Sequence, residues 1–399
     1  MTPTRLPLEG IRVLDLSRVL AGPYCAMLLS MLGAEVIKVE DRQGDEARFW
    51  PPQNRGLGSA FLGMNLNKRS IVVNLRLPSG PKLVRRLAAK SDVLVENFKT
   101  GDMERFGLGY EVLHQENPRL VFTSISAFGR IGPRASDPGY EALMQAYTGV
   151  MDITGFPEGD PARCGVSFLD MSTGITSALA TVSALYRREH TGEGGRVDAS
   201  LLQSALGLMT PLVSSFFQNG VNPQRLGTAH PNVVPYQSFS TRDGGIFIAS
   251  ANQNLWERLC RVLKREDLIT DPRFVNNPSR VQHRGECVDL MQQEIARWNT
   301  DELNSALQAA GVPAGKVNRV ADMLTDAQPQ AIQAIAAVED PRYGKLRSSN
   351  LPFHMDGHPG SVRHRAPYLG EHTRDILKEF GVPEHEMDEL FTQGVVAGE

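Results

Sequence analysis

Short apolar runs alternate with helix-like stretches over the first 130 residues. Residues 11–16 and 35–40 have the length and composition of buried strands. Between them, Gly22 and Pro23 open a helical stretch, and Gly33 lies where a helix would end. This order predicts a strand–helix–strand unit.

The same alternation continues to Ser126. Strands are predicted at residues 71–75, 92–97 and 120–126, and helices at residues 81–90 and 110–115. Repeated β-α-β order predicts an α/β fold with a parallel sheet covered by helices. Ligands of such sheets bind beyond the carboxyl ends of the strands. The predicted walls of a site are therefore the loops that follow Leu16, Glu40, Asn97 and Ser126.

The chain from Gly139 to about Gln218 is predicted to be mainly helical. Residues 171–188 carry almost no charge until their end and should form a buried helix. The longest uncharged run, residues 199–224, is long enough to span a bilayer. It contains Pro211 and several Ser, Gln and Asn residues, so a buried connecting helix explains it better.

A change in composition marks a second domain. Residues 222–235 are rich in Asn, Pro, Gly and His, which is typical of a linker. A strand at residues 245–250 and three helices follow. The predicted organisation is a large domain over 1–220, a linker over 221–235, a smaller α/β domain over 236–325 and a C-terminal segment over 326–399.

Composition and charge exclude several classes of protein. The 399 residues carry a formal net charge of −3, which argues against nucleic acid or an anionic membrane as a partner. The four cysteines form no Cys-x-x-Cys pair, so neither a zinc ribbon nor a disulfide framework is indicated. Residues 1–9 lack the apolar core of a signal peptide, and we expect a cytoplasmic protein.

Two features bear on phosphate binding. The turn at residues 17–23 has no Gly-x-Gly-x-x-Gly fingerprint and the chain has no Walker A sequence, which disfavours nicotinamide and ATP sites. Lys38, Lys68, Arg69 and Arg105 are predicted near adjacent strand–helix connections, where together they could pair with phosphates. Any one of them alone is more simply a solvated surface charge.

Asp170 is a lone carboxylate at the start of the predicted buried helix. It could be a helix N-cap. By position alone the cap is the simpler interpretation, but the same geometry suits a nucleophile, because the N–H groups of a helix N-terminus would keep a partly desolvated carboxylate ionised. Tyr140 and Glu141 begin another helix, where an acidic residue is often only a partner of the helix dipole.

Several motifs occur in order along nearly the whole chain. They are PLEGIRVLDLS (7–17), AGP (21–23), LGAEVIKVE (32–40), NKRSI (67–71), VENF (95–98), GP (132–133), GVSFLDMSTG (165–174) and LGEHT (369–373). In register, they resemble the family III CoA-transferases, the group of formyl-CoA transferase and carnitine CoA-transferase.

This resemblance implies roles for individual residues. Asp170 matches the nucleophilic aspartate, and Tyr140 and Glu141 match a pair near it. The positions that match the CoA site are Lys38, Lys68, Arg69, Asn97, Phe98 and Arg105. CoA and acyl-CoA would be substrates, with no permanently bound cofactor and no metal.

The resemblance also implies a fold, an assembly and a mechanism. A Rossmann-like large domain, to which the C-terminal segment returns, would be joined to a smaller α/β domain. Two chains would interlock as a homodimer with each active site between them. CoA would pass between acids through a mixed anhydride and an aspartyl-CoA thioester.

Departures from formyl-CoA transferase narrow the substrate. That enzyme has Gln where this chain has Leu20, beside the active site, and its glycine-run loop is not found here. Residues 227–237, which include His230, look like the branch that moves CoA from succinyl-CoA to dicarboxylic acids. The resemblance thus implies succinyl-CoA or a similar donor and a dicarboxylic acceptor.

Two other functions remain open. An α-methylacyl-CoA racemase would share the fold, but it needs a His as an acid–base group. No His occurs between Ser126 and Asp170. A non-catalytic CoA-binding subunit of a heteromeric transferase would lack the nucleophile, whereas Asp170 is present.

Overall fold

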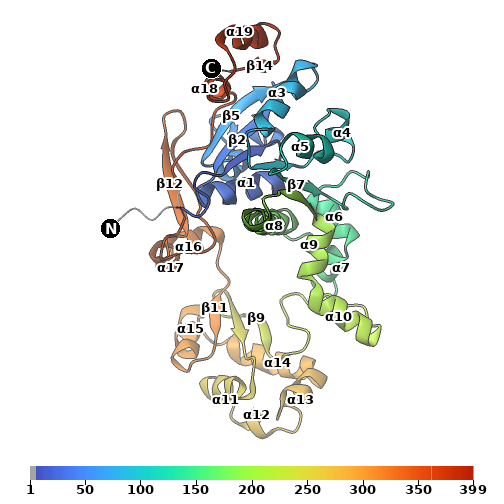
Figure 1. Ribbon diagram of the computed structural model, residues 1–399. Helices are drawn as coiled ribbons and strands as arrows, with labels where there is room; N and C mark the ends of the chain where they lie inside the picture. Colours follow the sequence, from blue (N-terminus) through green and yellow to red (C-terminus); the bar gives the residue numbers. More distant parts are fainter. Residues whose placement is uncertain (1–5, 361, 399) are drawn as a thin grey trace. The chain divides into compact units, whose positions relative to one another are not determined.

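The computed structural model describes residues 6–360 and 362–398, which form two compact units (Figure 1). The larger unit combines the described residues of Met1–Val150, Cys164–Val221 and Ala327–Glu399, and the smaller unit combines Met151–Arg163 and Asn222–Asp326. Residues 1–5, on which part of the signal-peptide prediction depends, lie outside the described residues.

A seven-stranded sheet forms the centre of the larger unit. Six strands are parallel, and the short β14 is antiparallel to β5 at one edge. In spatial order the strands are β14 (Val396–Ala397), β5 (Lys68–Val73), β2 (Glu35–Glu40), β1 (Arg12–Asp15), β6 (Val93–Glu96), β7 (Val121–Ser126) and β8 (Gly195–Ser200). This arrangement confirms the predicted α/β fold with a mainly parallel sheet.

The chain changes direction across the sheet at β1. Leu14 of β1 pairs with Ile37 of β2 on one side and with Leu94 of β6 on the other. The connections after β1 and β6 therefore lead away from each other and leave a crevice beyond the carboxyl ends of these strands. Open α/β sheets bind ligands at such a switch point.

Helices cover both faces of this sheet (Figure 1). The helices of the larger unit are α1 (Ala21–Met31), η1 (Glu46–Arg48), α2 (Ser59–Met64), α3 (Ser79–Ala88), α4 (Asp102–Arg105), α5 (Tyr110–Glu116), α6 (Glu141–Tyr147), α8 (Phe168–Thr191), α9 (Leu201–Leu208), α10 (Thr210–Asn219), α17 (Ala327–Ala331), α18 (Thr373–Glu379) and α19 (Glu384–Thr392). One core contains apolar residues of α3, α5, α18 and α19, and the other those of α1 and α8. Two hairpins complete the unit: β3 (Gln53–Asn54) with β4 (Leu57–Gly58), and β12 (Ile335–Asp340) with β13 (Gly344–Ser349).

Helix α8 approaches α1 closely at Gly174. A Cβ atom at this glycine would lie 2.8 Å from the carbonyl oxygen of Ala21 and 3.0 Å from a ring carbon of Tyr24. Among the described helices, α8 alone is long and apolar enough to cross a membrane by length and composition. Its residues Ala178 and Leu185 lie in the core with α1, which accounts for that composition.

The structure differs from the prediction between α8 and the smaller unit. Strand β8 was expected to be helical, because Arg196 and Asp198 give this edge strand a polar sequence without an apolar run. Residues 199–224 do not form one buried helix either. Two short helices, α9 and α10, meet at Met209, and no residue of α10 is buried within this chain.

The smaller unit has its own core. It contains a three-stranded antiparallel sheet of β11 (Ala314–Lys316), β10 (Gly245–Ala249) and β9 (Tyr236–Ser240). Its helices are α11 (Gln253–Val262), α12 (Asp267–Thr270), α13 (Asn277–Gln282), α14 (Arg284–Ile295), α15 (Thr300–Ala309) and α16 (Val320–Thr325). The short α7 (Val150–Ile153) begins at the last residue of a segment of the larger unit. Trp256, Phe274 and Leu303 are fully buried in this second core.

Candidate active site

A pocket of about 560 Å³ lies at the switch point of the large sheet. Its walls are the loops that follow β1, β6 and β7, together with Glu46 of η1 and the first turn of α8. The loops that the sequence predicts as site walls therefore do meet in space. They surround one carboxylate of α8, that of Asp170.

Asp170 is the third residue of α8, behind the N-cap residue Ser167. It is therefore not the cap of this helix, which was one of the two roles expected for it. Its side chain is half-buried and lines the pocket. Within the part of the chain that the structure describes, no hydrogen bond or ion pair engages its carboxylate.

Burial raises the pKa of Asp170 to about 7, and the charge of Glu141 adds to the increase. The sequence suggested instead that the N-terminus of the helix would keep this carboxylate ionised. Loss of water and the neighbouring negative charge outweigh that attraction. Near neutral pH the free protein thus holds Asp170 in both protonation states, and the ionised form is a more basic nucleophile than an exposed aspartate.

Tyr140 and Glu141 begin α6 and line the same pocket. Tyr140 is exposed, whereas Glu141 is buried and accepts a 2.6 Å hydrogen bond from Nε2 of Gln145. Oε1 of Gln145 in turn accepts a 2.9 Å hydrogen bond from the backbone N–H of Cys164. This chain of contacts fixes α6 against the segment that leads into α8.

Leu20, Asn97, Phe98 and Arg105 line the same pocket, and the binding of CoA by Asn97, Phe98 and Arg105 stays a prediction. The side-chain amide of Asn97 binds the backbone of the pocket wall. It accepts a hydrogen bond from the Arg18 N–H and donates one to the Arg18 carbonyl, both at 2.8 Å. The ring of Phe98 lies 5.3 Å from the Arg18 guanidinium. Arg105 is exposed and pairs with Asp102 at 3.0 Å.

Lys38 and Lys68 lie elsewhere, and this corrects their predicted position in the CoA site. Lys38 is fully buried and its Nζ donates to Asp45 and to the carbonyl of Ser17, each at 2.9 Å. Lys68 donates to Asp15 at 2.8 Å, in a pair that is also fully buried. Both lysines are in strands of a sheet that is covered on both faces, so no phosphate can reach them.

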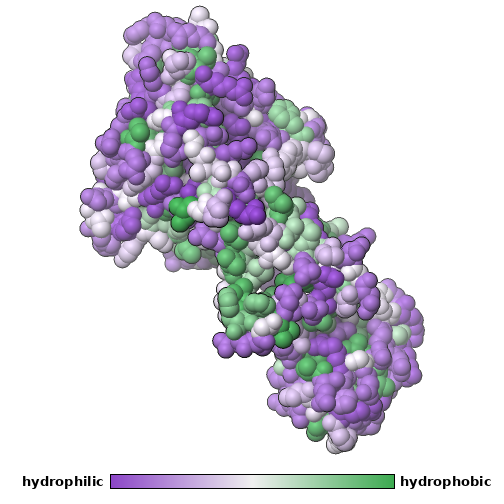
Figure 2. All heavy atoms as spheres, turned by 90° about the vertical axis from the view of Figure 1, so that its right-hand side faces the viewer, coloured by the Kyte–Doolittle hydropathy of each residue, from purple (hydrophilic) through white to green (hydrophobic). Residues whose placement is uncertain are grey.

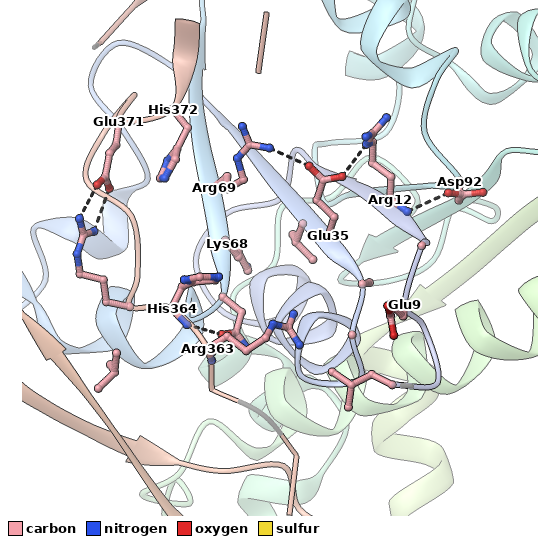
Figure 3. A pocket seen from close by; sticks show the side chains of 18 of the residues that line it. Glu9, Arg12, Glu35, Lys68, Arg69, Asp92, Arg363, His364, Glu371 and His372 are labelled. Carbon is pink, nitrogen blue, oxygen red and sulfur yellow. Dashed lines mark hydrogen bonds and ion pairs between the residues drawn. The ribbon is translucent and has the colours of Figure 1, made fainter. Parts of the chain in front are cut away.

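Arg69 lies in a different pocket, of about 1160 Å³, at the amino ends of the strands (Figure 3). It is at the start of β5, and Figure 3 shows it beside Glu35, which also binds Arg12. Arg69 additionally forms two hydrogen bonds with Glu379, at 2.7 and 2.8 Å. The strand was predicted to begin at Ile71, and its earlier start places Arg69 at the edge of the sheet opposite Asp170.

His230 belongs to the smaller unit. Its ring lies 5.3 Å from that of Tyr236, and its Nδ1 accepts a hydrogen bond from the backbone N–H of Asn232. Its role near the substrate stays a prediction.

Neither Arg130, which lines the pocket, nor Asp45, which lies behind its wall, was predicted to have a role at the site. Arg130 lines the pocket and binds Glu96 at 2.7 Å and the Phe98 carbonyl at 2.8 Å, which joins the loops after β6 and β7. Asp45 accepts from the backbone N–H of Val19. Both lie in loops that follow predicted strands, and this position was the available signal, since such loops carry the functional side chains of these sheets.

Comparison with known proteins identifies the family. The profile of CoA-transferase family III matches residues 8–373. A succinyl-CoA:glutarate CoA-transferase from Mus musculus is 37% identical over 98% of this chain and 90% of its own length. A succinate–glutarate CoA-transferase from Agrobacterium fabrum is 38% identical over 94% of this chain and 95% of its own length. The crystal structure of a CAIB/BAIF family protein from Brucella suis has a TM-score of 0.84 at 37% identity and covers 94% of this chain and 100% of that chain. The α/β fold, the carboxylate in its crevice and these full-length matches together show that the chain belongs to CoA-transferase family III and is a CoA-transferase.

Proposed function

We propose that this enzyme moves CoA from succinyl-CoA to a dicarboxylic acid, with Asp170 as the nucleophile. The observation that carries the proposal is the unpaired, half-buried carboxylate of Asp170 at the switch point of the sheet. The substrate class is supported by the relatives named for succinyl-CoA and glutarate.

The first half of the reaction transfers CoA to the protein. An oxygen of ionised Asp170 attacks the thioester carbonyl, the C–S bond breaks, and CoA leaves as a thiolate. The product on the protein is a mixed anhydride. The thiolate then attacks the aspartyl carbonyl, which releases the donor as succinate and leaves an aspartyl-CoA thioester.

The second half repeats these steps with the acceptor. A carboxylate of the acceptor attacks the aspartyl thioester, expels the thiolate and forms a second anhydride. Attack of the thiolate on the acceptor carbonyl releases the new acyl-CoA and regenerates Asp170. Each bond that breaks is replaced by one of similar energy, so the exchange needs no ATP.

Groups around Asp170 support these steps. Leu20 and Ala21, at the start of α1, line the pocket, and the backbone N–H groups of a first helical turn can stabilise the oxyanion of each addition. Arg105 is an exposed cation at the pocket and is suited to a phosphate of CoA, alongside Asn97 and Phe98. Lys38, Lys68 and Arg69 are not part of this proposed CoA site.

Arg18 is suited to the second carboxylate of the acceptor. Its side chain lines the pocket of Asp170 and is partly exposed. The ion pair that it forms, with Asp41, is long at 3.4 Å. A dicarboxylate could replace that weak contact with a bidentate pair, whereas a monocarboxylic acid has no charge left for it.

A homodimer is also part of the proposal. Exposed apolar side chains extend over α6, α8, α9 and α10: Leu143, Tyr147, Ile175, Leu179, Tyr186, Leu206, Leu208, Phe216 and Phe217. Figure 2 shows apolar side chains gathered on this side of the molecule. A second copy over this surface would bury it and would help to exclude water, which otherwise hydrolyses the anhydride.

A racemase gains no support from the site. No histidine is among the described residues that line the pocket of Asp170. The acid–base pair that abstracts and returns an α-proton would therefore be incomplete.

Intact-protein mass spectrometry tests the proposal. Wild-type enzyme mixed with succinyl-CoA should gain a CoA-sized, hydroxylamine-sensitive adduct on the peptide that contains Asp170. Asp170→Ala should remain folded, form no adduct and lose almost all transfer activity. Asp198→Ala, which removes a carboxylate of β8 outside the pocket, is the matched control and should form the adduct normally. Substantial turnover by Asp170→Ala would remove Asp170 from the mechanism.

A further inference from the structure

The wall of the Asp170 pocket contains a residue in an unfavourable backbone conformation. Val19 has a φ of 71°, and it is the one β-branched residue with a positive φ among the described residues. An L-residue with a branched Cβ strongly disfavours this region. Contacts from the surrounding structure must therefore hold the turn in place.

Side chains from separate elements provide those contacts. Both carboxylate oxygens of Asp45 lie 3.2 Å from the backbone N–H donor of Val19. Nζ of Lys38 donates to Asp45 and also to the carbonyl of Ser17, two residues before Val19. Asn97 binds both backbone groups of Arg18. The backbone of the turn is thus held at Ser17, Arg18 and Val19.

The ion pair between Lys38 and Asp45 does not line the pocket itself. The side chains are 0% and 1% exposed, and the pocket wall begins at Arg18 and continues through Val19 and Leu20. Any effect of the pair on a bound substrate must therefore pass through the backbone of the turn. The turn leads directly into Ala21, the first residue of α1.

We propose that the Lys38–Asp45 ion pair is a positioning device for the transferase site. It holds Val19 in the left-handed region and so places Leu20 and the start of α1 opposite Asp170. The inference depends on the proposed role of that pocket. It gives Lys38 a function in the reaction that differs from direct contact with CoA.

A purely structural role predicts different behaviour. Removal of one partner of a buried ion pair lowers stability, but a loss of stability alone would act in the same way whatever residue occupies position 19. A positioning role makes the effect of Lys38 depend on the strain at Val19. Glycine adopts a positive φ without strain, so Val19→Gly removes the need for the clamp.

A double-mutant cycle between Lys38→Met and Val19→Gly tests this dependence. The readouts are kcat/KM for succinyl-CoA per active site, with active sites counted by the CoA adduct, and Tm. Lys38→Met should lower kcat/KM by about tenfold or more when position 19 is Val. The same change should cost threefold or less in the Val19→Gly background. Equal losses in both backgrounds, or no loss in the first, overturn the proposal.

Two further variants keep the result interpretable. Asp45→Asn replaces Lys38→Met in the cycle if the lysine variant does not fold, since it removes the ion pair with almost no change of volume. Arg188→Met removes a buried cation at the far end of α8, where Arg188 binds Asp92. It should lower Tm, leave kcat/KM per active site unchanged and show no dependence on position 19. Failure of the proposed function can be told apart from failure of the positioning role, because in the first case the wild-type enzyme would form no CoA adduct at all.

Discussion

Asp170 in the first turn of α8 and Glu141 in the first turn of α6 are two carboxylates that line one pocket. Burial raises the pKa of Asp170 to about 7, and Glu141 adds to this rise. The proposed attack by Asp170 requires its ionised form, so on this proposal the pair links activity to pH.

We expect kcat/KM for succinyl-CoA to rise with pH through about 7. Below this value Asp170 is mainly protonated, and above it mainly ionised. Glu141→Gln removes one of the two causes of the raised pKa, so the midpoint of the profile should move to lower pH. Glu189→Gln, at the exposed far end of α8, should leave the midpoint in place. An unchanged midpoint in Glu141→Gln would show that Glu141 does not act on Asp170.

We expect Asp170→Asn to stabilise the protein at alkaline pH. The pKa of Asp170 is raised in the folded state, so its ionised form opposes folding at every pH above the unfolded pKa of about 4. The penalty grows up to about pH 7 and is complete above it. Asp170→Asn should therefore raise Tm at pH 8 by roughly 2–5 °C, corresponding to about 1–2 kcal/mol. The gain should vanish near pH 4, and a gain that is independent of pH would contradict this account.

We expect Gly174→Ala to lower both stability and activity. The new Cβ would approach the Ala21 carbonyl oxygen to 2.8 Å and push α8 away from α1. Overpacking of this kind costs about 1–3 kcal/mol, and the shift would also displace Asp170, one turn earlier in α8. Gly285→Ala in α14, where nothing lies within 4 Å of the new Cβ, is the control and should keep full activity. Thermal unfolding and kcat would separate the two effects.

We expect Arg18→Met to discriminate between acceptors. If Arg18 binds the second carboxylate, the variant should lose about tenfold or more in kcat/KM for glutarate, as expected for a charge-assisted hydrogen bond. Transfer to a monocarboxylic acid such as butyrate should change much less. Equal losses for the two acids would assign Arg18 to CoA or to the structure of the loop.

We expect a charge on α10 to weaken self-association. Phe217 is 79% exposed in the single chain, and Phe217→Glu would place a carboxylate in the proposed interface. Sedimentation should show a shift from dimer to monomer, with activity falling in parallel at low protein concentration. Val275→Glu, at an exposed apolar residue of the smaller unit, is the control for an added charge. A wild-type protein that sediments as a monomer would end the dimer proposal.

Much of the architecture can be predicted from the sequence because most strands and helices have a local pattern of apolar and polar residues. The apolar runs at β1, β2, β6 and β7 and the helices α1, α3 and α5 lie within a few residues of their predicted bounds, whereas η1, α2 and α4 were not predicted. Strand β8 was missed because it is polar and lies at an edge, so pairing with β7 rather than its own composition makes it a strand.

Part of the site could also be predicted from the order of the strands. Residues that directly follow parallel strands converge at one edge of the sheet, so Leu20, Asn97 and Phe98 could be expected near one another. Asp170 and Glu141 were assigned through the resemblance to family III enzymes, and the structure brings both to the same pocket.

The sequence by itself thus determined the alternation of strands and helices up to β7 and the residues at the carboxyl ends of these strands. Tertiary structure alone decided the direction and the charge state of particular side chains. Lys38 and Lys68 point into the protein because Asp45, in the loop after β2, and Asp15, on the separate strand β1, form ion pairs with them there. Asp170 has a raised pKa because folding removes water and brings Glu141 close. Burial and charge pairing depend on packing between elements, and no local pattern in the chain encodes them.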